Sequence, residues 1–186
     1  MKVGIAALVM MAWAGPACAQ HQNHQAPYAG FQQREVKALS EQQISDLRAG
    51  RGMGLALPGE MNGYPGPLHV LELADQLQLS AAQRQRVQQL FEAMKAEAIP
   101  VGETLIQQES ALDRQFAEQK ISPDVLTQLT AQIGETQGRL RAVHLKYHLT
   151  TAELLTAHQR HRYAELRGYR SGSACPQDLS FVLDLF

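Results

Sequence analysis

Hydrophobic positions along most of this chain recur every three or four residues, the spacing of one face of an α-helix. The longest series runs from Val87 to Phe116 in steps of mostly four and three, and a second runs from Leu126 to Leu154. The sequence has few β-branched runs and lacks the alternation of apolar and polar residues that is typical of strands. The pattern therefore predicts an all-α fold.

The two long series predict two helices of roughly 30 residues, each about 45 Å long. A turn at Ile121–Asp124 separates them, and so short a connection predicts an antiparallel helical hairpin. Shorter helices are expected over 34–49 and 68–79, and again from Thr156 to Gly168, which gives four to five helices. A hairpin alone leaves much of its apolar face open, so a homodimer is also expected.

Three short segments carry a helix-start signal, an apolar residue followed by Ser or Thr and, three positions later, by Gln. They are Leu39-Ser40-Glu41-Gln42-Gln43, Leu79-Ser80-Ala81-Ala82-Gln83 and Leu155-Thr156-Ala157-His158-Gln159. In such a capping box the hydroxyl accepts from a free backbone N–H, and the Gln reaches back to the cap's own N–H. Between the first two boxes, segment 50–67 holds six Gly and three Pro and is expected to be an irregular connector.

The chain begins with features of a secretory signal peptide, namely Lys2, an apolar stretch and a small-residue cleavage site ending at Ala19. Residues 1–19 are therefore expected to be removed on export; a lipoprotein acylated at Cys18 is the alternative. Residues 20–33 read as a flexible arm rich in His and Gln. The remaining parts are the connector region 34–67, a helical domain over 68–169 and a tail over 170–186 that contains Cys175 and is apolar enough to dock.

Charge excludes some partners. Lys2 is the only charged residue before position 20, so the mature chain has 16 Lys and Arg against 18 Asp and Glu. This slightly acidic balance gives no electrostatic reason to expect nucleic acid or an anionic membrane as a partner. Beyond the signal, no apolar run reaches the length of a membrane span.

His144 and His148 are the strongest candidates for chemistry. Residues four apart lie on one face of a helix, so this pair can chelate a divalent transition metal. Each follows a core-facing residue, which predicts a partly solvated position. Zinc, copper, nickel or cobalt would need further ligands; the candidates are His21, His24, Met53, Glu60, His69 and Glu153. The alternative is that both imidazoles are interhelical polar groups bound to water.

The other features do not favour catalysis. His158 and His161 lie among Arg160 and Arg162, so they are expected on an exposed helix face. The sequence has no His-Glu-x-x-His, no Gly-x-Ser-x-Gly and no paired-Cys zinc motif. We therefore expect a protein that is not an enzyme.

The signal peptide, the helical hairpin and the boxes at Leu79, Ser80, Gln83 and at Leu155, Thr156, Gln159 together resemble the Spy/CpxP superfamily of periplasmic proteins, in particular its heavy-metal-sensor branch. The resemblance covers about residues 68–169. It implies small helical proteins, typically dimers of long bent hairpins, that modulate envelope-stress and metal-responsive signalling or act as ATP-independent chaperones. In metal-sensing members a His followed four residues later by a second ligand precedes the second box, and His144 and His148 fit that arrangement.

These features lead to two functional expectations. The first is a non-enzymatic periplasmic stress protein of the heavy-metal resistance or sensor type, which binds a transition metal at His144 and His148. The alternative is a chaperone for unfolded client proteins or a modulator of an envelope sensor kinase. The superfamily's chaperone surface is usually basic, and the acidic balance of this chain weakens that alternative.

Overall fold

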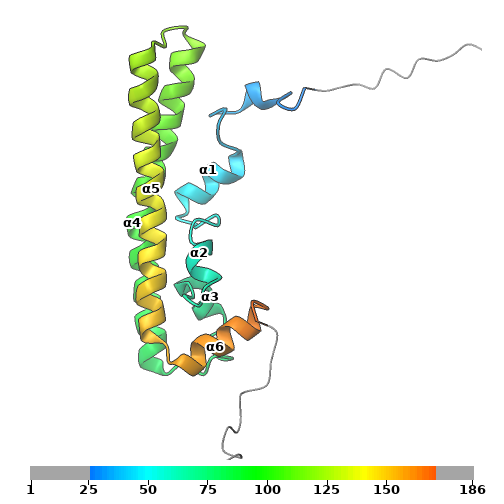
Figure 1. Ribbon diagram of the computed structural model, residues 1–186, viewed down its shortest axis with the longest axis vertical. Coiled ribbons are helices and arrows are strands. Elements are labelled where there is room, and N and C mark those ends of the chain that lie inside the picture. Colours follow the sequence, from blue (N-terminus) through cyan, green and yellow to red (C-terminus); the bar gives the residue numbers. More distant parts are fainter. Residues whose placement is uncertain (1–25, 171–186) are drawn as a thin grey trace, which may run out of the picture.

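Two long helices, α4 (Ala81–Ala117) and α5 (Pro123–Leu154), pack together along their length in this computed structural model, which describes residues 26–170 (Figure 1). Within that range the chain forms six α-helices, a short 3-10 helix and no strand, so the all-α prediction is confirmed. The remaining elements are η1 (Phe31–Gln33), α1 (Glu41–Arg48), α2 (Leu57–Glu60), α3 (Pro67–Glu72) and α6 (Ala157–Leu166).

All three boxes start helices as the sequence predicts. Ser40, Ser80 and Thr156 each have an extended backbone and accept from the N–H three residues later, while the Gln at that position accepts from the cap's N–H. Ser122 caps α5 in the simpler way, with a proline at the start of the helix. The caps therefore set where α1, α4, α5 and α6 begin.

α4 and α5 hold each other through polar as well as apolar contacts. Helix α4 continues through Pro100, which removes one backbone donor without ending the helix. Near its centre, Glu97 accepts from the Lys146 ammonium at 2.6 Å and from the Tyr147 hydroxyl at 2.6 Å. These bonds lower the pKa of Glu97 and tie the two helices at mid-length.

Helices α1, α2 and α3 follow one another along one side of the α4–α5 pair (Figure 1). Val36, Leu47 and other residues near α1 form a core cluster with Val101, Leu105 and Leu140. The approach is close at Gly102, where an added Cβ would lie 2.8 Å from the Leu47 carbonyl oxygen. A glycine at this position lets the backbone of α1 meet α4 directly.

One end of the pair, here called the base, is closed by α6 and by the segment that leads into α4 (Figure 1). Val70, Leu77, Val87, Leu155 and Tyr163 are buried together there. At the other end, here called the tip, no residue between Ile106 and Ile133 is buried. Phe116 and Leu126, which end and begin the two apolar series, are exposed there because no short helix extends far enough to cover them.

The short helices differ from the sequence prediction in three ways. Helix α1 begins at Glu41, not at residue 34, because Ser40 adopts the extended backbone of a cap. The connector 50–67 contains the one-turn helix α2, which has a proline in its first turn. Helix α3 ends at Glu72, and the chain then turns back to reach the Ser80 cap. Six helices therefore replace the four to five expected.

Residues 26–33, placed in a flexible arm by the sequence analysis, include a turn and η1. The signal peptide, His21, His24, Cys175 and the apolar part of the tail lie outside the described residues. Among those that are described, no helix combines the length and the apolar character needed to cross a membrane.

Candidate functional site

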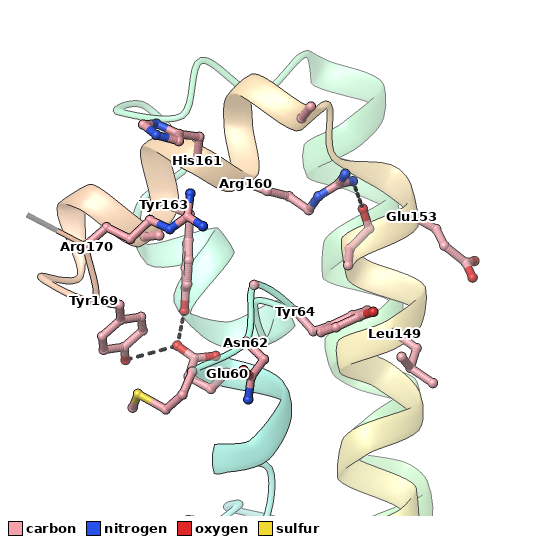
Figure 2. Close-up of a pocket in the computed structure, with 15 residues that line it drawn as sticks. Glu60, Asn62, Tyr64, Leu149, Glu153, Arg160, His161, Tyr163, Tyr169 and Arg170 are labelled. Atoms are coloured by element: carbon pink, nitrogen blue, oxygen red, sulfur yellow. Dashed lines mark hydrogen bonds between the residues drawn. The ribbon is translucent and has the colours of Figure 1, made fainter. Parts of the chain in front are cut away.

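Glu60, at the end of α2, is the centre of a buried polar cluster. Its side chain is only 6% exposed, and it accepts hydrogen bonds from the Tyr163 hydroxyl, from the Tyr169 hydroxyl at 3.2 Å and from the Gly66 N–H at 3.2 Å (Figure 2). Nε of Arg167 lies 3.8 Å from the same carboxylate. These donors come from α6, from the residues after it and from the start of α3, so one carboxylate joins several elements at the base.

Two of the predicted metal ligands face this carboxylate. Nδ1 of His69 lies 3.4 Å from one Glu60 oxygen, and Nδ1 of His148 lies 3.6 Å from the other. Nδ1 of His148 also donates to the Tyr64 carbonyl oxygen at 2.7 Å. In the neutral imidazole this leaves Nε2 of His148 with a free lone pair. The ring packs so closely on Gly66 that an added Cβ there would lie 2.7 Å from Nε2.

His144 lies one turn before His148 and is 2% exposed. Its Nε2 is buried and has no hydrogen-bond partner, which is unusual because buried polar atoms are nearly always paired. Burial, together with the nearby His148, lowers the pKa of His144 and favours the neutral imidazole. The prediction that both imidazoles are partly solvated is wrong. Helix α5 is covered by α4 on one side and by the segment around α2 on another.

These side chains line one cavity of 570 Å³, here called the first cavity, which lies between the segment around α2 and the α4–α5 pair. Glu60, His69, His144 and His148 contribute the atoms suited to a metal ion, and the cationic side chains of Arg51, Lys95 and Arg167 also line the cavity. Met53 and Met94 add thioethers, with Met53 exposed and Met94 buried. The cavity thus brings together residues about 80 positions apart in the sequence.

Two opposing effects set the pKa of Glu60. Burial raises the pKa of this carboxyl, but hydrogen bonds from His69, Tyr163 and the Gly66 N–H outweigh burial and lower the pKa to about 2. Burial and the bond to Glu60 raise the pKa of the Tyr163 hydroxyl, which therefore stays a donor. At neutral pH the site holds one carboxylate anion surrounded by donors.

The fit to a metal ion is mixed. Imidazole and carboxylate are suitable ligands for zinc, nickel or cobalt, and Nε2 of His144, which has no hydrogen-bond partner, is available to coordinate a metal. However, no group of three or more His, Cys, Asp or Glu side chains within residues 26–170 is already placed around one metal position. Tyr163 and Tyr169 donate to Oε1 of Glu60 and the Gly66 N–H donates to Oε2, so three of about four lone-pair sites are used and one remains for a metal.

The other histidines that the structure describes and Glu153 do not line the first cavity. Glu153 lies on α5 but is directed away from Glu60 (Figure 2). It lines a different cavity of 670 Å³, here called the second cavity, between the 61–64 loop, α5 and α6. His158 and His161 are exposed on α6, as the sequence predicts. His21 and His24 lie outside the described residues.

The two boxes at the base are joined directly, which the sequence analysis missed. The amide of Gln83 donates to Gln159 Oε1 at 2.9 Å, and the amide of Gln159 donates to Gln83 Oε1 at 3.1 Å. Each amide also donates to a backbone carbonyl oxygen, Leu154 for Gln83 and Leu77 for Gln159. Every amide donor and acceptor of the pair is therefore used. The repeated box was the signal, but spacing alone does not show that two boxes meet.

The sequence analysis also missed the partners of Glu60. Tyr163 is buried, and a buried tyrosine usually needs a partner for its hydroxyl. Nothing in the sequence identifies that partner as Glu60, more than 100 residues earlier.

Comparisons of this chain with protein-family models, with characterised proteins and with solved structures find no match.

Proposed function

We propose that this protein is a non-enzymatic metal-binding protein of the periplasm that senses or buffers a divalent transition metal in the first cavity. The observation that carries the proposal is the lining of that cavity, which combines one ionised carboxylate, Glu60, with three imidazoles. One of those, His144, has a buried nitrogen without a partner. The resemblance to the heavy-metal-sensor branch of the Spy/CpxP superfamily supports the same function.

The proposed ligands are His144 and His148 from α5, with Glu60 and His69 from the segment that packs on it. Zinc, nickel, cobalt and copper(II) all suit imidazole and carboxylate. Binding requires neutral imidazoles and an ionised carboxylate, and the low pKa of Glu60 supplies the second condition. Tyr163 and Tyr169 both donate to Oε1 of Glu60, so Oε2, which accepts only from the Gly66 N–H, is the oxygen more open to a metal.

Isothermal titration calorimetry of the mature chain, residues 20–186, with zinc, nickel, cobalt and copper(II) tests this proposal. We expect one ion per chain with a Kd well below about 100 μM. His148→Ala and Glu60→Gln should each weaken binding by at least tenfold. His158→Ala is the matched control because that imidazole is exposed on α6. The proposal fails if no ion binds, or if the His148 and His158 variants behave alike.

A chaperone function is the second candidate, and one observation favours it. Five large apolar side chains of the segment around α2 are exposed: Met53, Leu57, Met61, Tyr64 and Leu68. Contiguous exposed apolar groups often mark protein interaction sites. Suppression of the aggregation of a denatured model protein at stoichiometric ratio, without ATP, tests this function. Replacing Leu57 and Leu68 by Ser should reduce the suppression; equal activity of both proteins would exclude this surface.

The last proposal concerns the arrangement of the two long helices and the oligomeric state. We propose a Spy/CpxP-like antiparallel hairpin that forms homodimers, in which a second copy covers part of the bare tip near Phe116 and Leu126. Light scattering coupled to size exclusion tests the dimer. A monomer at all concentrations would rule it out. Docking on an envelope sensor protein is the accompanying partner hypothesis, tested by pull-down from envelope extracts.

A further inference from the structure

Much of the wall of the first cavity is apolar and takes no part in the metal site. The volume of 570 Å³ falls in the range of small-molecule pockets. The apolar wall includes Met53 and Leu57 from the segment around α2, Leu68 from α3, and Phe91 and Met94 from α4. Met53, Leu57 and Leu68 are 41%, 50% and 39% exposed. A bound apolar group would remove these side chains from water, and the flexible thioethers can adapt to its shape.

Lys95 on α4 lines the same cavity and is partly buried. Its ammonium lies 5.6 Å from the centre of the Phe91 ring. The structure describes three other lysines, and each contacts a carboxylate, Lys37 at 2.9 Å, Lys120 at 2.7 Å and Lys146 at 2.6 Å. Among the described lysines, only Lys95 has no carboxylate partner. Because partial burial of an unpaired charge costs free energy, an anionic ligand group would stabilise this ammonium.

The other formal charges around the cavity are already paired. Glu60 is the only carboxylate among the described lining residues, and two tyrosine hydroxyls and a backbone N–H donate to it. Nε of Arg167 lies 3.8 Å from Glu60, and Nε of Arg51 lies 2.5 Å from Asp46. Lys95 therefore leaves one positive charge in the cavity without a counterion.

One positive charge beside an apolar wall defines the class of ligand. A monocarboxylate balances a single ammonium, whereas a phosphate monoester would bring close to two negative charges. His144 adds a polar atom, since its buried Nε2 has no hydrogen-bond partner. A neutral imidazole can carry its proton on either nitrogen, so Nε2 can donate to a carboxylate oxygen.

We propose that the first cavity binds an apolar monocarboxylate with a single unbranched chain, the chemistry of a medium-chain fatty acid. The carboxylate pairs with the Lys95 ammonium, and the chain covers Met53, Leu57 and Leu68. This binding requires no metal, so the inference stands apart from the function proposed above.

Chemical-shift titration of the ¹⁵N-labelled mature chain, residues 20–186, with a chelator present, tests the proposal. Octanoate, octanol and octyltrimethylammonium share one chain length and differ in the head group. We expect octanoate to bind with a Kd of about 1 mM or below and to shift the amide signals of Gly52 and Lys95, but not those of the 118–122 turn. Octanol should bind about tenfold more weakly because it lacks the charge, and the cation should not bind. Equal affinity for octanoate and octanol, or no binding of either, would overturn the proposal.

Variants separate the role of the ammonium from that of the apolar wall. Lys95→Gln should weaken octanoate binding about tenfold and leave octanol binding unchanged. Leu57→Ser, at a half-exposed position, should weaken both ligands alike. Lys120→Gln is the matched control, because this exposed lysine lies in the turn between α4 and α5, and it should change neither affinity.

Two further results would contradict the proposal. Equal octanoate affinity of the Lys95 and Lys120 variants would show that the ammonium does not hold the carboxylate. Binding to phosphatidylglycerol vesicles without binding of octanoate would assign the same chemistry to a membrane surface. Because the chelator excludes metals from these titrations, their failure would leave the metal proposal unaffected.

Discussion

The reciprocal amide pair at the base makes a quantitative prediction about Gln159→Ala. The Gln159 side chain forms four hydrogen bonds, one with the Thr156 N–H, one with the Leu77 carbonyl oxygen and two with Gln83. At a net value of about 0.5–1.5 kcal/mol each, their loss should lower the free energy of unfolding by about 2–6 kcal/mol. For a chain of this size that corresponds to a fall in Tm of roughly 4–24 °C.

The chain provides its own control for this prediction. Gln43 occupies the same position in the α1 capping box, but its amide accepts only from the exposed Ser40 N–H. Gln43→Ala should therefore cost only about 0.5–1 kcal/mol. Comparing the two variants separates the contribution of a helix cap to the free energy of unfolding from the contribution of the hydrogen bonds that link two caps.

Urea unfolding followed by far-ultraviolet circular dichroism, at one fixed protein concentration, measures all the variants. The double variant of Gln83 and Gln159 should be more stable than the sum of the single changes implies, with a coupling of about 1–2 kcal/mol, because each single change already breaks the shared bonds. Additive effects within about 0.5 kcal/mol would refute the reasoning. So would a Gln159 variant no less stable than the Gln43 variant.

Three further predictions follow from the core and the Glu60 cluster. The pKa of Glu60, about 2, lies below its ordinary value of 4.5, so Glu60 stabilises the fold above about pH 4.5. That contribution, about 3 kcal/mol, is lost as pH falls toward 2, and acid titration of Glu60→Gln should lack it. Tyr163→Phe should cost about 1–3 kcal/mol in urea unfolding by leaving a buried acceptor short of a donor. Gly102→Ala should lower the free energy of unfolding by about 1–3 kcal/mol through its clash with the Leu47 carbonyl oxygen. Gly134→Ala, with open space around it, should raise the free energy of unfolding by about 0.5–1 kcal/mol.

Each of these predictions can fail clearly. An unchanged acid transition in the Glu60 variant would mean that the carboxylate is not ionised in the fold. A Tyr163 variant of wild-type stability would show that the hydroxyl bond contributes nothing. Equal stability of the two glycine variants would contradict the close approach of α1 to α4 at Gly102.

The parts of the fold that could be predicted are those with a local signal. The periodic apolar spacing located both long helices, and the hydroxyl–Gln boxes located three helix starts, because a cap depends only on residues three apart. The helix α2 escaped prediction because glycine and proline dominate its segment. Which part of the apolar face stays uncovered could not be predicted, because periodicity shows which face is apolar and not whether a partner covers it.

The candidate site was only partly accessible from the sequence. His144 and His148 share a helix face by local spacing, which the sequence reveals. Their burial depends on a segment about 80 residues earlier that folds back over α5, and its course is not encoded in local spacing. The tyrosine donors to Glu60 could not be predicted for the same reason, since Tyr163 lies 103 residues away.

The uneven cover of the α4–α5 pair has a consequence for how the molecule opens. The base combines a buried core cluster with the Gln83–Gln159 pair, whereas no residue between Ile106 and Ile133 is buried. Local opening costs least where few apolar contacts must break. Helices α4 and α5 should therefore separate first at the tip and stay packed at the base. Backbone amides should therefore exchange with deuterium in a gradient along each helix. The base, where α6 lines the second cavity, is the last part of the molecule to lose its shape.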